Sequence, residues 1–109
     1  MTSFEVRESL ACLRDLARIE VHLIETTGDA ALAERRIAEI RATTRKLLEF
    51  PRLGPDRSDF GKDIRLLTAS AKPVALYAVQ EEAGIVLMLR AFYVGEDYEA
   101  LVSAENDNI

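Results

Sequence analysis

The sequence contains one cysteine and one histidine, and this scarcity excludes several kinds of site. Cys12 cannot form an internal disulfide, and it lies among apolar residues at helical spacing, so we expect it to fill space in the core. Cys12 and His22 fall in one predicted helix, and together they cannot supply the ligands of a metal cluster. A nucleophile–histidine pair would have to use His22, which we expect to be a packed side chain of that helix.

Glycines and apolar runs are equally sparse. The five glycines are scattered singly, so no glycine-rich loop is present to bind a phosphate. The longest strongly apolar run, Ile85–Leu89, is far shorter than the roughly 20 residues that a membrane span needs. The N-terminus lacks the basic-then-apolar pattern of a secretory signal. We therefore expect a cytoplasmic protein that uses no cofactor, no metal and no membrane.

Composition and charge describe an ordinary globular chain with an uneven charge distribution. With 109 residues, 49% of them hydrophobic and 30% charged, residues 1–109 suit a single domain with one core. The net charge is −5, yet residues 34–72 hold ten Lys and Arg against six acids, and both flanks are acidic. A basic middle suits an acidic protein partner, whereas specific nucleic-acid binding usually rests on a basic domain and is not expected.

The first half of the chain has helical periodicity after a short strand. Residues 4–7 alternate apolar and polar, which predicts a half-buried strand. From residue 10 to 25 the apolar positions recur at helical steps, while Asp15 and other charged residues fill the remaining faces. A break at Thr26–Asp29 precedes a second helix over 30–49. The short break between the two helices predicts an antiparallel helical hairpin.

A proline ends the second helix. Pro51 has no amide hydrogen and disfavours helical geometry at Phe50, and Gly54-Pro55 prevents a quick restart. Phe50 and Leu53 are too apolar to leave in water, so we expect them to fold back and pin the loop to the core. In the loop over 51–63 only Leu53 and Phe60 are expected to be buried.

The second half has the shorter period of strands. Strands are predicted at 64–68, 74–80 and 85–94, and their short connections require antiparallel pairing in a meander. The third strand is apolar on both alternating faces through to Val94, with Arg90 its one charge, so we expect it to be central. A short closing helix is expected over 96–103, with fraying over 104–109.

The predicted fold class is therefore α+β. An N-terminal strand precedes an antiparallel helical hairpin, which packs on a three- to four-stranded antiparallel sheet, and a short C-terminal helix follows.

Several short motifs occur along residues 4–102 in a characteristic order. They are Asp15-Leu16-x-x-Ile19, Ala33-Glu34-Arg35-x-Ile37, Leu47-x-Glu49-Phe50-Pro51-x-Leu53-Gly54, Tyr77-x-Val79 with Leu89-Arg90, and Asp97-x-Glu99-x-Leu101. In this order and spacing the chain resembles the RelE/ParE superfamily of bacterial type II toxins, and the ParE-like branch most closely. The resemblance implies a helical hairpin packed on a twisted antiparallel sheet, in agreement with the reading from periodicity.

The resemblance also implies a function. Such proteins are small cytoplasmic toxins held inactive by a cognate antitoxin, and those similar to ParE poison DNA gyrase. Those similar to RelE cut messenger RNA on the ribosome, with basic residues and a tyrosine that stabilise charge in the transfer. Here that alternative catalytic set would be Arg65, Arg90 and Tyr93. Because the net charge is negative, docking on ribosomal RNA is disfavoured, and we expect gyrase inhibition with no catalytic residue.

The chain departs from the ParE-like pattern at its end. Where that pattern reads Arg-x-x-His-x-x-Arg-Asp, this chain has Arg90, Tyr93, Glu96 and Asp97. A third interpretation, a non-toxic module that only binds an antitoxin, therefore stays open.

The resemblance also implies two sets of contact residues. The target-binding residues would be Arg90, Tyr93 and Tyr98. The antitoxin-binding residues would be Arg41, Arg45, Arg65 and Lys72, with an antitoxin segment lying across the sheet and the hairpin. Either a homodimer or a hetero-oligomer with the antitoxin is compatible with this arrangement.

Overall fold

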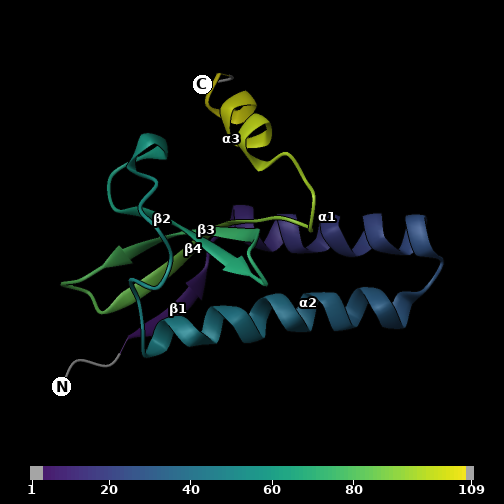
Figure 1. The fold of residues 1–109 in the computed structure, drawn as a ribbon, viewed down its shortest axis with the longest axis horizontal. Coiled ribbons are helices and arrows are strands. Elements are labelled where there is room, and N and C mark those ends of the chain that lie inside the picture. The colour runs from purple at the N-terminus through teal and green to yellow at the C-terminus, as the bar shows by residue number, and fades with distance from the viewer. Residues whose placement is uncertain (1–3, 108–109) are drawn as a thin grey trace.

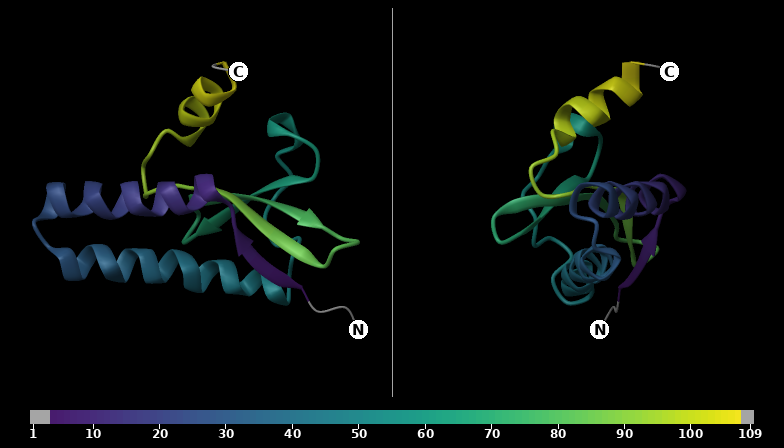
Figure 2. Two further views of the ribbon diagram at one scale, coloured as in Figure 1. Left: turned by 180° about the vertical axis from the view of Figure 1, so that it is seen from behind. Right: turned by 90° about the vertical axis from the view of Figure 1, so that its right-hand side faces the viewer.

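The computed structural model describes residues 4–107. Its elements in chain order are β1 (Glu5–Glu8), α1 (Leu10–Thr27), α2 (Ala30–Arg45), the 3₁₀ turns η1 (Lys46–Leu48) and η2 (Ser58–Phe60), β2 (Ile64–Ala69), β3 (Lys72–Gln80), β4 (Ile85–Ala91) and α3 (Tyr98–Asp107). The α1–α2 hairpin projects past one end of the sheet, and α3 stands on the side opposite α2 (Figures 1 and 2). The predicted α+β fold, with its helical hairpin, is confirmed.

The sheet has four strands in the order β1-β4-β3-β2. Strands β2, β3 and β4 form the predicted antiparallel meander, and β4 is an inner strand as expected. Strand β1, however, pairs with β4 in parallel, so the expectation of an all-antiparallel sheet is wrong. Short turns force antiparallel pairing only between strands that follow one another. The two helices and the rest of the meander separate β1 from β4 in sequence, so these two strands can pair in either the parallel or the antiparallel direction.

Local capping explains where the two long helices begin and end. The Ser9 side chain accepts a hydrogen bond from the Cys12 amide at 3.0 Å and starts α1. Gly28 ends α1 in the left-handed conformation, with φ of 70°. The Asp29 side chain then accepts from the Leu32 amide at 3.0 Å and starts α2.

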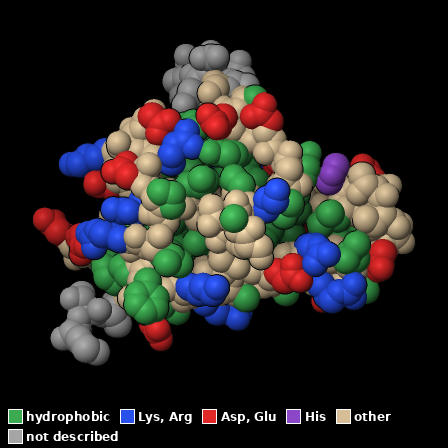
Figure 3. Space-filling model, viewed as in Figure 1, with side chains coloured by type: hydrophobic (Ala, Val, Ile, Leu, Met, Phe, Trp, Pro, Cys, Tyr) green, Lys and Arg blue, Asp and Glu red, His purple; other side chains and the backbone are tan. Residues whose placement is uncertain are grey.

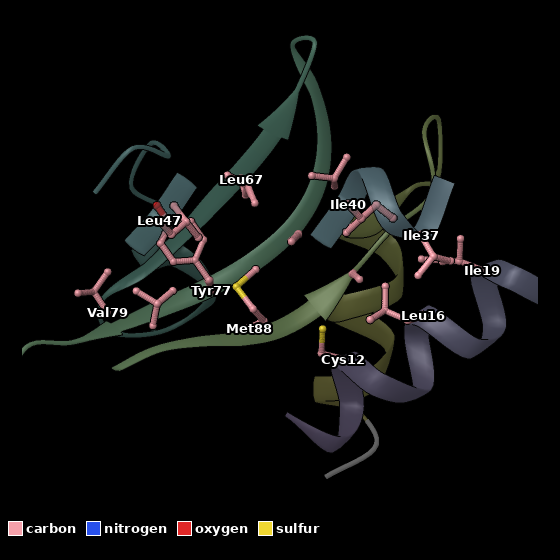
Figure 4. Packing of buried hydrophobic residues seen from close by; sticks show 14 residues of the cluster. Cys12, Leu16, Ile19, Ile37, Ile40, Leu47, Leu67, Tyr77, Val79 and Met88 are labelled. Atoms are coloured by element: carbon pink, nitrogen blue, oxygen red, sulfur yellow. The ribbon is translucent and has the colours of Figure 1, made fainter. Parts of the chain in front are cut away.

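The main core fills the space between the hairpin and one face of the sheet. Figure 4 shows residues of both helices and of three strands pointing into this space. Cys12 is 3% exposed here, so its predicted role as a core residue is confirmed. The buried members of this main cluster are Cys12, Leu16, Ile19, Ile37, Ile40, Leu47, Leu67, Val74, Ala75, Tyr77, Val79, Val86, Met88 and Ala91.

A second, smaller cluster lies on the other face of the sheet, under α3. Its buried members are Leu66, Leu76, Phe92 and Val102, with Phe60, Ile64, Tyr98 and Leu101 packed against them. The sheet is therefore apolar on both faces. Helix α3 runs to Asp107, beyond the end expected at Ser103, and residues 108–109 lie outside the described part.

Strand β4 contains a bulge that the sequence did not predict. Tyr77 pairs with Met88 while Leu76 pairs with Arg90, so Leu89 is an extra residue on β4. One extra residue exchanges the two faces for everything that follows it. Met88 and Ala91 accordingly both lie in the main cluster, and the expected unbroken alternation through Val94 is wrong.

The loop after α2 is held by backbone contacts. Phe50 and Leu53 are 61% and 52% exposed, so the prediction that they plug the core is wrong. Gly54 is buried instead, and its amide donates to the hydroxyl of Tyr77 at 2.9 Å. A Cβ at Gly54 would lie 2.1 Å from the carbonyl oxygen of Leu66, so the loop packs directly against β2. This close backbone approach anchors the loop without help from the apolar side chains.

Within residues 4–107, the helices are too short or too polar for any of them to cross a bilayer.

Candidate functional site

The charge in β4 is bound by an acid of α1. Arg90 donates from Nε to Asp15 Oδ2 at 2.6 Å and from Nη2 to Asp15 Oδ1 at 3.0 Å. The Ala91 amide donates to the same carboxylate at 3.0 Å. The Asp15 side chain is 6% exposed and that of Arg90 13% exposed. Asp15 therefore lies in the interior and not on an outer face of the helix as predicted, and Arg90 has little charge available for a partner.

A second ion pair extends this arrangement to the segment after β4. Arg18 donates from Nη1 to Glu96 Oε2 at 2.6 Å, and its Nη2 lies 3.5 Å from Asp15 Oδ1. Although burial lowers the pKa of Arg18, the hydrogen bond and charge of Glu96 raise it overall, so the guanidinium stays charged. We call Asp15, Arg18, Arg90 and Glu96 the charge cluster. It joins α1, β4 and the approach to α3.

Tyr93 is stacked on the only histidine. The rings of His22 and Tyr93 are 4.2 Å apart and inclined by 12°, and both residues are half-buried. This confirms His22 as a packed side chain. The two rings form one wall of a cavity of about 250 Å³ between α1, α2 and the Ala69–Val74 turn region.

Tyr98 joins α3 to the loop before β2. Its hydroxyl accepts a hydrogen bond from Arg57, and its ring lies 5.2 Å from that of Phe92. The Arg57 guanidinium also lies 4.4 Å from the centre of the Phe60 ring. The hydrogen bond to Asp59, together with the charges around it, raises the pKa of Arg57 above its ordinary value. Tyr98 thus holds α3 in place.

Arg65 and Arg90 lie on opposite faces of the sheet. Arg65 is paired with Tyr77, and Arg90 with Leu76. Directly paired residues share a face, and consecutive residues of β3 point to opposite faces. Arg65 also donates to the Gly54 carbonyl at 2.8 Å, which ties it to the loop. The alternative catalytic residues Arg65 and Arg90 are therefore not brought together.

Two of the four expected antitoxin-binding residues do lie together. Arg41 and Arg45 line an open groove of about 480 Å³ between β1 and the C-terminal half of α2. Arg41 donates from Nε to Glu8 Oε2 at 3.1 Å and from Nη2 to Glu8 Oε1 at 3.2 Å. That hydrogen bond raises the pKa of Arg41. We call this feature the β1–α2 groove, and Figure 3 shows Lys and Arg side chains spaced along the α2 side of the molecule.

The other two residues of that set lie elsewhere. Arg65 faces the Gly54 loop, and Lys72 is exposed at the β2–β3 turn, paired with Ala69. Among the residues described, no group of three or more His, Cys, Asp or Glu side chains could hold a metal ion.

The sequence alone did not predict which acids pair with the arginines described above. Asp15 stands three residues after Cys12 and four before Ile19, so it falls on the buried stripe of α1. An acid in that stripe is the signal for a buried cation, and Arg90 is the one charge in its apolar strand. Glu8 and Glu96, which pair with Arg41 and Arg18, gave no comparable signal, because neither stands within a predicted apolar stripe.

Comparison with solved structures identifies the architecture. A chain of a chromosomal ParDE TA system from P. aeruginosa superposes with a TM-score of 0.70 and 20% identity, covering 86% of this chain and 99% of that chain. The protein has the RelE/ParE fold. A chain of the toxin–antitoxin complex RelBE2 from Mycobacterium tuberculosis shares this RelE/ParE fold, with a TM-score of 0.60, 17% identity and coverage of 84% and 98%. By sequence, no family and no curated protein matches the chain.

Proposed function

We propose that this protein is the toxin of a type II toxin–antitoxin pair, neutralised by a cognate antitoxin. The observation that carries the proposal is the RelE/ParE fold, which covers 86% of this chain and 99% of the ParDE chain. Both solved relatives come from assemblies described as toxin–antitoxin systems or complexes. The basic side of α2, with Arg41 and Arg45 in the β1–α2 groove, supports an acidic protein partner.

Within that role, we propose that the toxin acts by binding, with DNA gyrase as its target. Cleavage of RNA needs cations that converge on the phosphate and stabilise the charge that develops there. Arg65 and Arg90 lie on opposite faces of the sheet, and each already bonds to a protein group. The net charge of −5 further disfavours docking on ribosomal RNA.

The runner-up is a ribosome-dependent endoribonuclease of the RelE type, which the likeness to the RelBE2 chain favours. A non-toxic module that only binds an antitoxin is the third reading. At position 96 the chain departs from the ParE-like pattern, and this departure is relevant to the third function. Glu96 pairs with Arg18, so the residue has a structural role of its own. An arginine at that position, as in the ParE-like pattern, would meet Arg18 with like charge.

Induced expression in a bacterial host separates these functions. We expect growth arrest with gyrase-linked double-strand breaks and altered plasmid topology, both relieved by the product of the adjacent short reading frame. Codon-aligned cuts in transcripts would favour the endoribonuclease. A matched control is Ile37→Asp, which puts a charge in the main cluster, unfolds the protein and should remove any arrest. Unimpaired growth with folded wild-type protein would contradict the toxin function.

A further inference from the structure

Helix α1 is apolar on two opposite sides. Its inner side contributes buried residues to the main cluster. A helix at the surface of a protein in water normally carries polar residues on the side away from its core. The outer side of α1 instead exposes large apolar side chains, which are Leu10, Leu13, Val21 and Ile24. A contiguous exposed apolar surface of this kind is typical of a protein–protein contact.

These side chains form one narrow stripe with Ala17 at its centre. Ala17 is exposed as well. With a turn of about 100° per residue, the four large residues lie within about 40° of the direction of Ala17, and no other residue of α1 does. The stripe extends about 21 Å along the helix. We call it the outer stripe, and its residues are Leu10, Leu13, Ala17, Val21 and Ile24.

The outer stripe is symmetric about Ala17. Leu10 and Ile24 stand seven residues before and after Ala17. Leu13 and Val21 stand four residues before and after it. In a two-fold symmetric contact, if residue i meets residue j of the second copy, then j also meets i. Two copies of α1 that cross antiparallel at Ala17 therefore set apolar residue against apolar residue throughout, with the smallest residue where the helices come closest.

The charges beside the outer stripe favour the antiparallel direction. Arg14 borders its first half, and Glu20 and Glu25 border its second half. Within residues 4–107 none of these three side chains takes part in an ion pair. Antiparallel packing sets the basic half of each helix against the acidic half of the other, and it also opposes the two helix dipoles. Parallel packing would bring Arg14 of both copies to the same level.

The rest of the molecule leaves room for such a contact. Figure 2 shows the C-terminal half of α1 projecting beyond the sheet. A contact of one helix from each copy along about 21 Å is smaller than the roughly 1,600 Å² that a stable interface buries, so the pair should be weak and should dissociate on dilution. None of the outer-stripe residues lines the β1–α2 groove, so this contact does not use the arginines of that groove.

We propose that two copies of this chain associate through the outer stripe, with their α1 helices antiparallel and crossing at Ala17. The pairing is carried by α1 alone, and it holds whether or not the protein acts as a toxin.

Sedimentation velocity of the full chain over a range of concentrations tests the pairing. The wild-type protein should shift from monomer to dimer as its concentration rises. Ala17→Glu places two carboxylates at the two-fold axis and should weaken association at least tenfold. Its far-ultraviolet spectrum should stay unchanged, since Ala17 is exposed and glutamate is a good helix former. The matched control, Ala38→Glu, makes the same change at an exposed position of α2 and should associate as the wild type does.

Cysteine cross-linking determines the direction of the helices. When a Leu10→Cys chain and an Ile24→Cys chain are mixed and mildly oxidised, the disulfide-linked product should contain one chain of each kind. Either variant alone should give little product, because antiparallel packing keeps its two introduced cysteines at opposite ends of the contact. The native Cys12 is 3% exposed and should not compete.

Three results would overturn the proposal. A protein that stays monomeric at every concentration would show that the outer stripe has another occupant or none. Association that is undiminished in Ala17→Glu would place the contact on another surface. Disulfides formed mainly between like cysteines would show that the helices pack in parallel.

Discussion

At the scale of single residues, the structure is decided by a few polar groups placed in apolar surroundings. Asp15 accepts three short hydrogen bonds, from two nitrogens of Arg90 and from the Ala91 amide. Through these bonds, a carboxylate of α1 supplies the hydrogen-bond acceptors for the donors at the bulged end of β4. Breaking a buried ion pair from one side leaves the other charge uncompensated, which is far more destabilising than losing an exposed pair.

Replacing Asp15 by Asn should therefore lower the free energy of unfolding by about 3 kcal/mol, because Arg90 keeps its charge at 13% exposure. The control is Glu39→Gln, which removes an exposed pair with Arg36 and should cost less than about 1 kcal/mol. Urea unfolding of both variants measures the difference. Equal losses of unfolding free energy in the two variants would show that the charge cluster stabilises the fold no more than an exposed ion pair does.

Because of Cys12, we expect the free energy of unfolding to decrease as the pH becomes alkaline. Burial, with smaller contributions from Glu8 and Asp15, raises the pKa of its thiol from 9.0 to about 12. Between these values the unfolded chain loses the proton and the folded chain keeps it, so the stabilising contribution is complete below pH 9 and disappears as pH rises toward 12. Burial also raises the pKa of Tyr77, which acts in the same direction.

We therefore expect the urea midpoint to fall above pH 9, and to fall less steeply in Cys12→Ala. A thiol reagent such as Ellman's reagent should react with Cys12 only after unfolding, since the residue is 3% exposed. Rapid labelling of the native protein at neutral pH would contradict the buried placement.

At the scale of elements, the junctions matter more than the regular helices and strands. The bulge at Leu89 turns Arg90 to one face and Ala91 to the other. The loop after α2 passes so close to β2 that Gly54 has no space for a side chain. The Gly54 amide is in turn satisfied by the Tyr77 hydroxyl, a buried polar contact within the main cluster.

Gly54→Ala should consequently destabilise the protein by more than about 2 kcal/mol, because its Cβ would meet backbone atoms of Leu66 that cannot move aside cheaply. Leu53→Ala is the neighbouring control and should stay within about 0.5 kcal/mol, since Leu53 is largely exposed. Thermal unfolding followed by circular dichroism compares them. A greater loss in the Leu53 variant would restore the apolar side chain as the anchor of the loop.

At the scale of the whole molecule, the sheet separates two cores of unequal size. The main cluster, drawn in Figure 4, joins the hairpin to one face of the sheet. The second cluster joins α3 to the other face. Because α3 belongs only to the smaller cluster, the hairpin and the sheet should fold without it.

Val102→Asp tests this layering. A carboxylate among Leu66, Leu76 and Phe92 should release α3 and expose the segment around Gly95 to protease, while the remaining fold keeps its far-ultraviolet spectrum. Limited proteolysis followed by mass measurement would show one early cut before α3. Global unfolding of this variant would mean that the two clusters are a single cooperative unit.

The sequence by itself determined the elements and most of the topology. The helical period, the caps Ser9 and Asp29 and the break at Pro51 are local signals, and so are the short turns that impose the antiparallel meander. The motifs in their order led to the RelE/ParE fold. Of the four residues that the resemblance implies for antitoxin binding, Arg41 and Arg45 stand one helical turn apart in sequence, and both line the β1–α2 groove.

Only the tertiary structure decided the rest. The parallel pairing of β1, the bulge at Leu89 and the burial of Asp15 against Arg90 all join segments that are distant in sequence. Phe50 and Leu53 were misplaced for the same reason, because a backbone contact to β2 anchors their loop and has no signature in hydrophobicity. Local propensity governs which elements form, whereas long-range pairing and packing determine how they meet and which charges stay exposed.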